Sequence, residues 1–180
     1  MPPYDPQAAQ RANVHSSPPE GPGGGSPYDD PTGFLNRQGL LAELEAMVLE
    51  ANDRNESVVA IAILVECPTR PAFDRRRDGT SRLLDHASLE VMMAAPAGFL
   101  VGRLGQHEFA IAGRVRDSKA ANEALVRLRQ RLAPRPGTPE SELVTFASAA
   151  AMTCALPTKT AEALLAQAGT LLKEQLRARG

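Results

Sequence analysis

Two carboxylates in this sequence could hold a divalent cation. Glu66 ends a long apolar run, and Glu108 lies within the polar tetrapeptide Gly105-Gln-His-Glu108. Carboxylate oxygens are the ligands that Mg²⁺ prefers. A Mg²⁺ ion between Glu66 and Glu108 would take these oxygens as ligands and keep several of its waters. The alternative is that the tetrapeptide is an ordinary solvated loop or a contact surface for another protein.

The tetrapeptide lies between two short apolar runs, from Phe99 to Leu104 and from Phe109 to Gly113. Runs of this length that are bounded by glycine are typical of two strands joined as a hairpin. Gly105 is expected to take the positive φ that a tight reversal requires. Gln106, His107 and Glu108 would then lie side by side at the tip of the hairpin.

Composition argues against two classes of partner. Lys and Arg total 20 against 21 for Asp and Glu, so no strong field draws the chain to nucleic acid or to an anionic membrane. The longest apolar run, Val58 to Val65, is far shorter than a bilayer span. Cys67 and Cys154 are too few for a disulfide framework and are expected to be reduced thiols. We therefore expect a cytoplasmic protein that does not insert into a membrane.

The first 28 residues are rich in proline and glycine and contain almost nothing that a core could use. Such a segment cannot offset the entropy lost on ordering, so residues 1–28 are expected to be a disordered tail that acts as a spacer. Residues 29–180 are long enough to form one domain with its own core.

Hydrophobic periodicity predicts eight elements in this domain. A helix follows Asn36, and the continuous apolar run Val58 to Val65 is expected to be a central strand covered on both faces. Residues 66–80, with a basic cluster at Arg75 to Arg77, are expected to form an exposed loop. The rest are a helix that stops before Pro96, the hairpin, a helix capped by Asp117 or Ser118 with its arginines mostly outward, a strand from Leu143 to Ala151, and a helix capped by Thr158 or Thr160.

This order gives an α+β fold, the βαββαβ arrangement of ferredoxin-like domains, flanked by an N-terminal and a C-terminal helix. In that arrangement the first strand lies antiparallel beside the third. The end of the first strand then comes next to the hairpin tip, so Glu66 and Glu108 are expected to approach each other.

Three segments, in this order, resemble the GGDEF family, the diguanylate cyclases that condense two GTP molecules into cyclic di-GMP with Mg²⁺ on a palm-like sheet. Asp29-Asp-Pro-Thr-Gly-Phe-Leu-Asn-Arg37 is similar to the opening D-x-L-T-G-L-x-N-R, with Pro31 in place of leucine. Arg103-Leu-Gly-Gln-His-Glu-Phe109 is similar to R-x-G-G-D-E-F. Ala161 to Leu172 resembles the closing helix, A-D-x-L-L-x-x-A-D-x-A-L-Y. The resemblance covers about Asp29 to Gly180 and implies a palm of GGDEF type.

The signature motif is degenerate here, since Gly105-Gln-His-Glu-Phe109 stands where the family has G-G-D-E-F. Gln106 fills space that the second glycine leaves to the nucleotide, and His107 replaces a metal-binding acid. The family's D-x-D at the end of the first strand falls on Val65-Glu-Cys67 or on Glu66-Cys-Pro68, so at most one carboxylate remains there. Because Mg²⁺ takes oxygen ligands almost exclusively, the resemblance implies a half-built metal site with little activity.

Two other family sites also depart from the pattern. The product-inhibition motif R-x-x-D falls on Pro96-Ala-Gly-Phe99, which contains neither residue. The guanine-reading Asn and Asp should lie between Phe73 and Leu89, where the chain has no Asn. Neither feedback binding nor base recognition of the family's kind is expected.

The leading hypothesis is therefore a catalytically incompetent GGDEF-like module that regulates or binds a signalling protein, such as another GGDEF protein, in cyclic-di-GMP signalling. Its contact surface is expected around Arg103, Gln106, His107 and Glu108, and no cofactor is expected. The alternative is a divergent diguanylate cyclase or GTP-binding protein that uses Mg²⁺ and GTP. It would keep the metal between Glu66 and Glu108, with His107 as an added ligand or acid/base group. A third interpretation is a ferredoxin-like domain unrelated to nucleotides.

Overall fold

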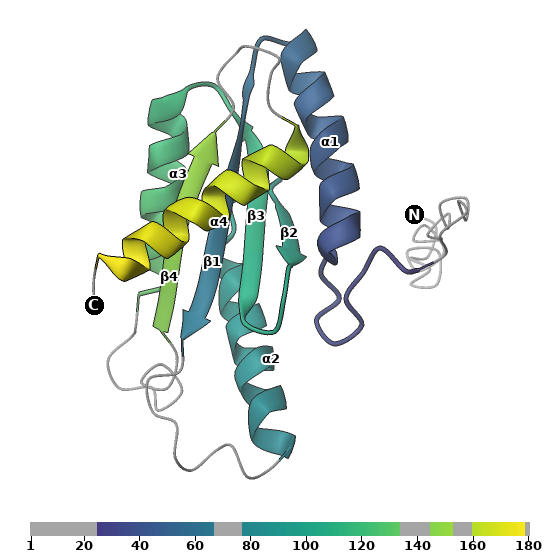
Figure 1. Ribbon diagram of the computed structural model, residues 1–180, viewed down its shortest axis with the longest axis vertical. Coiled ribbons are helices and arrows are strands. Elements are labelled where there is room, and N and C mark those ends of the chain that lie inside the picture. Colours follow the sequence, from purple (N-terminus) through teal and green to yellow (C-terminus); the bar gives the residue numbers. More distant parts are fainter. Residues whose placement is uncertain (1–24, 67–76, 134–144, 153–159, 179–180) are drawn as a thin grey trace, which may run out of the picture.

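The computed structural model describes residues 25–66, 77–133, 145–152 and 160–178 (Figure 1). Within them the chain forms eight elements in the predicted order. They are α1 (Arg37–Asp53), β1 (Ser57–Glu66), α2 (Arg77–Ala94), β2 (Leu100–Arg103), β3 (Glu108–Val115), α3 (Ser118–Arg131), β4 (Thr145–Met152) and α4 (Ala161–Arg177). No helix in these ranges is long and apolar enough to cross a membrane.

The four strands form one antiparallel sheet in the order β2-β3-β1-β4. β1 lies in the centre, with Leu64 opposite Glu108 of β3 and Glu66 opposite Thr145 of β4. Nine of its ten residues are at least partly buried, as a strand covered on both faces must be. The predicted ferredoxin-like arrangement with flanking helices is confirmed.

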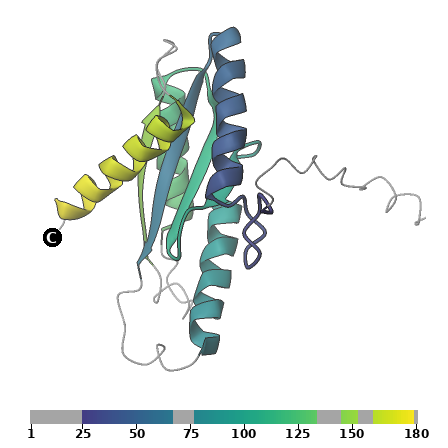
Figure 2. The ribbon, with the colours of Figure 1, turned by 45° about the vertical axis from the view of Figure 1, so that its right-hand side comes forward.

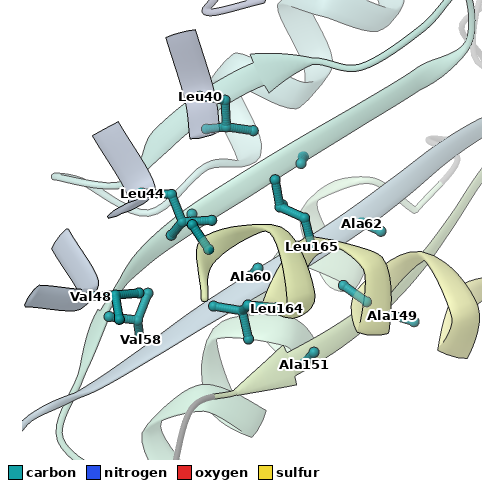
Figure 3. Close-up of a cluster of buried hydrophobic side chains, with 14 of the residues drawn as sticks. Leu40, Leu44, Val48, Val58, Ala60, Ala62, Ala149, Ala151, Leu164 and Leu165 are labelled. Carbon is teal, nitrogen blue, oxygen red and sulfur yellow. The ribbon is translucent and has the colours of Figure 1, made fainter. Parts of the chain in front are cut away.

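Two helices cover each face of the sheet. On one face, α1 and α4 bury a cluster in which large leucines from the helices meet small alanines from the strands (Figure 3). On the other, α2 and α3 cover a cluster built from the larger side chains of β1 and β3, including Ile61, Ile111 and Phe109. The small residues on the first face let α4 pack close to the sheet while crossing it diagonally (Figures 1 and 2).

Local capping signals locate the start of three helices. The side chains of Asn36, Asp117 and Thr160 accept hydrogen bonds from backbone N–H groups three residues later, at 2.9, 2.7 and 3.2 Å. Each bond satisfies a donor that the first helical turn leaves unpaired. The predicted caps of α3 and α4 are confirmed, and the structure selects Asp117 over Ser118 and Thr160 over Thr158. The cap at Asn36 was not predicted from the sequence.

Two local predictions were wrong. The predicted loop 66–80 extends too far, because α2 already begins at Arg77. Extending a nucleated helix by a few residues costs little, even through poor helix formers such as Gly79 and Thr80. In addition, Gly105 does not have a positive φ, which among the described glycines occurs only at Gly33 and Gly98. The four residues between β2 and β3 turn the chain widely enough that no left-handed residue is required.

The arginines of α3 are exposed, as predicted, but Arg129 also forms hydrogen bonds with two neighbouring elements. Its guanidinium donates to the Ser148 carbonyl oxygen of β4 at 2.5 Å and to the Gln175 side chain of α4 at 3.0 Å. A long aliphatic stem lets the charged group reach around the edge of the sheet. Arg129 therefore links α3, β4 and α4.

β2, at the opposite edge of the sheet, is also hydrogen-bonded along its outer side. The Leu35 N–H donates to the Val101 carbonyl at 3.2 Å, and the Arg103 N–H donates to the Leu35 carbonyl at 2.8 Å. The next residue, Asn36, also holds the chain that precedes Leu35, because its side-chain amide donates to the Ser26 carbonyl at 2.6 Å. Residues 1–24 of the predicted tail lie outside the described residues, so the boundary at Asp29 stays a prediction.

Candidate functional site

The tip of the β2–β3 hairpin is held by backbone bonds from both sides. The N–H groups of Leu104 and Gly105 donate to the Glu108 carbonyl at 2.8 and 3.2 Å, which closes the turn. The Val65 N–H donates to the His107 carbonyl at 2.9 Å. The end of β1 therefore lies against the tip, as the sequence predicted.

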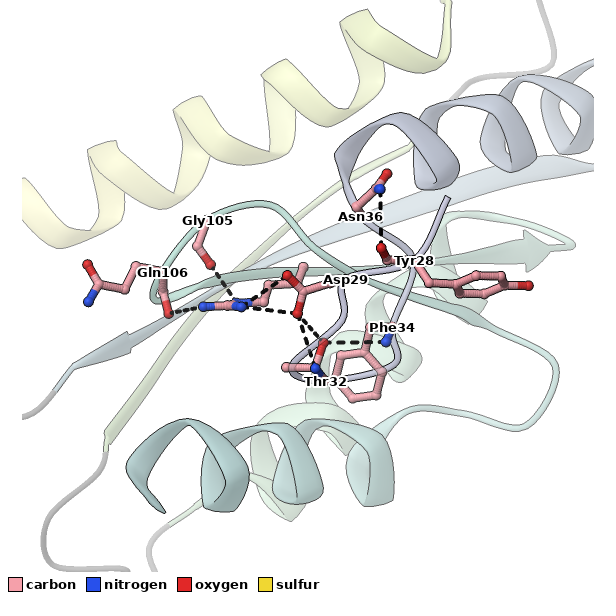
Figure 4. A network of polar contacts seen from close by, with 8 residues as sticks. Tyr28, Asp29, Thr32, Phe34, Asn36, Gly105 and Gln106 are labelled. Atoms are coloured by element: carbon pink, nitrogen blue, oxygen red, sulfur yellow. Dashed lines mark hydrogen bonds and ion pairs between the residues drawn. The ribbon is translucent and has the colours of Figure 1, made fainter. Parts of the chain in front are cut away.

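Arg103 fastens this tip to the segment that precedes α1. Figure 4 shows the partners on the two sides, with Asp29 in that segment and Gly105 and Gln106 at the tip. Its Nη1 donates to both carboxylate oxygens of Asp29 at 3.0 Å. The same guanidinium donates from Nε to the Gly105 carbonyl at 3.1 Å and from Nη2 to the Gln106 carbonyl at 3.5 Å. Its planar set of donors can serve several acceptors at once. We call this set of contacts the Arg103 clamp.

Asp29 is itself fixed by the turn that follows it. The Thr32 hydroxyl donates to Asp29 Oδ2 at 2.6 Å, and the Thr32 N–H donates to the same oxygen at 3.2 Å. Burial acts to raise the pKa of Asp29, but the Thr32 and Arg103 hydrogen bonds and the positive charge of Arg103 together hold that pKa below its usual value. The carboxylate is thus kept charged by the clamp that it completes.

We expect the clamp to weaken in acid. A carboxyl whose pKa is lower in the folded chain stabilises the fold above its unfolded pKa of about 3.9, and this contribution is lost as the pH falls through the folded value. Replacing Asp29 by Asn should cost about 1–3 kcal/mol at pH 6. That difference between wild type and variant should shrink steadily below pH 4 in urea unfolding experiments.

The Arg114–Glu50 pair supplies the control. It is also short, at 2.7 Å, but its side chains are 37% and 55% exposed, against 13% and 20% for Arg103 and Asp29. An exposed pair of this kind contributes about 0–1 kcal/mol, so Glu50→Gln should change stability little. An equal loss in the two variants at pH 6 would contradict a special role for the clamp.

The side chains at the tip differ in exposure. Gln106 and Glu108 are exposed and His107 is half-buried, so all three remain accessible to a partner. Arg103, the fourth residue of the predicted contact surface, forms the clamp, and its side chain is 13% exposed. Its hydrogen bonds to the Gly105 and Gln106 carbonyls hold the backbone from which the other three side chains project. The contact surface itself stays a prediction.

Glu66 and Glu108 lie on the same face of the sheet but not opposite each other. Leu64 is the register partner of Glu108, and Glu66 is two residues farther along β1. Two carboxylates that are offset by two residues on neighbouring strands can hold a cation only together with further ligands. No group of three or more His, Cys, Asp or Glu side chains gathers within the described ranges, and Cys67 and Pro68 lie outside them. This donor set is a poor fit for Mg²⁺.

Phe109, the last residue of the degenerate motif, belongs to the core. Its side chain is 1% exposed, and its ring meets that of Phe34 edge-on with 6.1 Å between centroids. Phe34 lies in the turn after Asp29, so this contact and the Arg103 clamp join the same two segments. Sequence patterns did not reveal this pairing, because the residues lie far apart in the chain.

The other predicted family positions are partly described. Pro96 to Phe99 form a short turn before β2, in which the Phe99 N–H donates to the Pro96 carbonyl at 3.1 Å. The segment searched for guanine-reading residues, between Phe73 and Leu89, lies partly outside the described residues. The basic cluster at Arg75 and Arg76 lies outside them as well.

Comparisons by sequence find no matching family model and no matching curated protein. Solved structures do match. A sensory box/GGDEF family protein from Caulobacter crescentus aligns with a TM-score of 0.71 at 24% identity, covering 85% of this chain and 99% of that one. The GGDEF domain of DgcB from the same organism, solved with c-di-GMP, aligns at 0.68 and 17%, covering 86% and 90%.

A third match is the diguanylate cyclase SiaD from Pseudomonas aeruginosa, solved in complex with its activator SiaC. It aligns with a TM-score of 0.69 at 24% identity, covering 85% of this chain and 59% of that one. The order of elements, the sheet topology and these alignments agree, and this chain has the fold of a GGDEF domain.

Proposed function

We propose that this chain is a catalytically incompetent GGDEF-like module that acts by binding another signalling protein through its hairpin tip, in cyclic-di-GMP signalling. The observation that carries the proposal is the Arg103 clamp. It holds in one shape a tip that exposes Gln106 and Glu108, of which only Glu108 carries a carboxylate that could bind a metal.

A rigid surface is what recognition requires. Binding is weakened when side chains and loops must be ordered at the interface, and a preorganised surface avoids much of that cost. The clamp, the Val65–His107 backbone bond and the buried Phe109 each restrict the tip. These restraints support a contact surface.

The chemistry of the tip supports the loss of catalysis. Phosphoryl transfer depends on positioning and on cations that neutralise developing charge. His107 offers a nitrogen in the place of an acid. Glu66 and Glu108 are offset by two residues on neighbouring strands, and no third carboxylate joins them among the described residues. Replacing a carboxylate also removes like-charge repulsion toward an acidic partner surface.

The structural neighbours support a role in cyclic-di-GMP signalling. DgcB was solved with c-di-GMP, and SiaD with a protein activator. A GGDEF fold is thus used both around this nucleotide and in contact with a second protein. We therefore place the partner of this chain among signalling proteins, with an active GGDEF protein as the first candidate.

The competing function is a divergent cyclase or GTP-binding protein with a metal between Glu66 and Glu108. The one observation in its favour is that both carboxylates lie on the same face of the sheet. Mg²⁺-dependent GTP binding that is lost in both Glu66→Gln and Glu108→Gln would support this alternative.

The proposal is tested by measuring binding to an active GGDEF domain. The triple variant Gln106→Ala, His107→Ala, Glu108→Ala should lose at least tenfold in affinity, because it removes the accessible side chains and leaves the backbone clamp in place. A truncated chain lacking residues 1–28 should bind almost as wild type does. Calorimetric titration measures both effects, and circular dichroism checks that each variant is folded.

A second triple variant provides the matched control. Lys119→Ala, Glu123→Ala and Arg127→Ala remove three exposed polar side chains from α3, away from the tip. Full binding by the tip variant together with loss in the α3 variant would place the contact on the helices. Loss only in the truncated chain would identify the tail as the functional element.

A further inference from the structure

A recess opens between α1 and α4 on the face of the sheet that these helices cover. The two helices lie close together near the start of α4 and spread apart toward the hairpin tip (Figure 1). The cavity between them measures about 380 Å³, within the range of small-molecule sites. Its floor is formed by β1 and by the start of β3, and its longer wall is α4.

The recess exists because small residues stand where larger ones would fill it. A Cβ atom added at Gly169 of α4 would meet nothing within 4 Å. Ala62 contributes only a methyl group from β1, and the surrounding lining includes Leu64, Leu165 and Leu172. The floor and wall are therefore apolar and can accept a hydrocarbon group.

Three charged side chains line the recess. Arg37 begins α1, Lys173 projects from α4, and Glu108 starts β3. All three are exposed, and no other described residue forms an ion pair with Arg37 or Lys173. Two cations and one carboxylate leave one net positive charge, which is complementary to a monoanion.

We propose that this recess binds a small amphipathic carboxylate, with its apolar chain on the alanine and leucine floor and its carboxylate near Arg37 and Lys173. Burial of the chain supplies most of the affinity, and the cations select the head group. The proposal does not rest on the function proposed above, because the recess and the accessible tip share only Glu108.

Decanoate is the first probe, measured by calorimetric titration against the full chain below its micelle concentration. Affinity should rise about fourfold per methylene from hexanoate through octanoate to decanoate. Decyltrimethylammonium, which carries the opposite charge on a similar chain, should bind more weakly than decanoate. No binding of decanoate, no dependence on chain length, or equal binding of the cationic amphiphile would overturn the proposal.

Gly169→Leu tests the location. The new side chain would enter the open space, and it replaces a poor helix former by a good one, so the fold should be at least as stable. Binding of decanoate should fall at least tenfold. Ala163→Leu, at an exposed position of α4 outside the recess, should bind as wild type does. Unchanged binding in a folded Gly169→Leu variant would show that the ligand lies elsewhere.

Lys173→Gln tests the head-group contact. Decanoate affinity should fall about two- to fivefold, the effect of one exposed ion pair, while binding of neutral decanol should not change. Lys119→Gln removes the same charge from α3 on the opposite face and should have no effect. Equal losses for decanoate and decanol would contradict the assigned orientation.

Discussion

Incubated with GTP and Mg²⁺, the purified chain is expected to form no cyclic di-GMP. His107 stands where the family has an acid, and Gln106 stands where it has a glycine that leaves space for the nucleotide. Losing one preorganised group that stabilises transition-state charge costs on the order of 100- to 1,000-fold in rate. This loss, together with the obstruction of the nucleotide by the Gln106 side chain, should place product formation below detection by liquid chromatography.

Restoring the signature should not restore activity. The double variant Gln106→Gly, His107→Asp rebuilds the tip, but it leaves only Glu66 at the described end of β1 and no RxxD motif before β2. An active GGDEF protein in the same buffer controls for assay conditions. Product formed by the double variant would show that the remaining site is intact, and product formed by the wild type would refute incompetence itself.

Phe109→Ala is expected to destabilise the fold by about 3–5 kcal/mol, the usual cost of removing a fully buried phenylalanine. The side chain is 1% exposed and fills the cluster beneath α2 and α3. It also carries the ring contact with Phe34, so its loss loosens the segment to which Arg103 fastens the tip. Urea unfolding monitored by circular dichroism measures the change.

Met93→Ala is the control for this substitution. Met93 lies on α2 and is 64% exposed, so its truncation should change stability by no more than about 0.5 kcal/mol. Phe34→Ala should fall between the two, because Phe34 is only partly buried. A loss below about 1 kcal/mol for Phe109→Ala would contradict the placement of this side chain in the packed core.

Local signals in the sequence were sufficient for most of the fold. The apolar run from Val58 to Val65 predicted a central strand because a strand buried on both faces cannot alternate with polar residues. Asp117 and Thr160 predicted helix starts because a cap satisfies a donor only three residues away. In each case the cause and the effect lie within one short segment.

The site was harder to predict, because its main contact joins distant segments. Asp29 and Arg103 lie 74 residues apart, and nothing near either residue shows that they meet. The recess beside Glu108 depends on the angle at which α4 crosses the sheet, which periodicity does not give. The prediction for Gly105 failed for a different reason. A positive φ is required in a tight turn, but the turn between β2 and β3 is wider and does not require one.

The bonded edges of the sheet limit how this domain can be recognised. Exposed strand edges commonly recruit partners by adding a strand, which is a largely sequence-independent form of binding. Here Leu35 bonds to the backbone of β2, and Arg129 takes the Ser148 carbonyl of β4. These bonds occupy part of each edge, whereas the side chains at the tip lie outside the core. If the tip is the contact surface proposed above, point substitutions at Gln106, His107 or Glu108 would change the choice of partner without disturbing the scaffold.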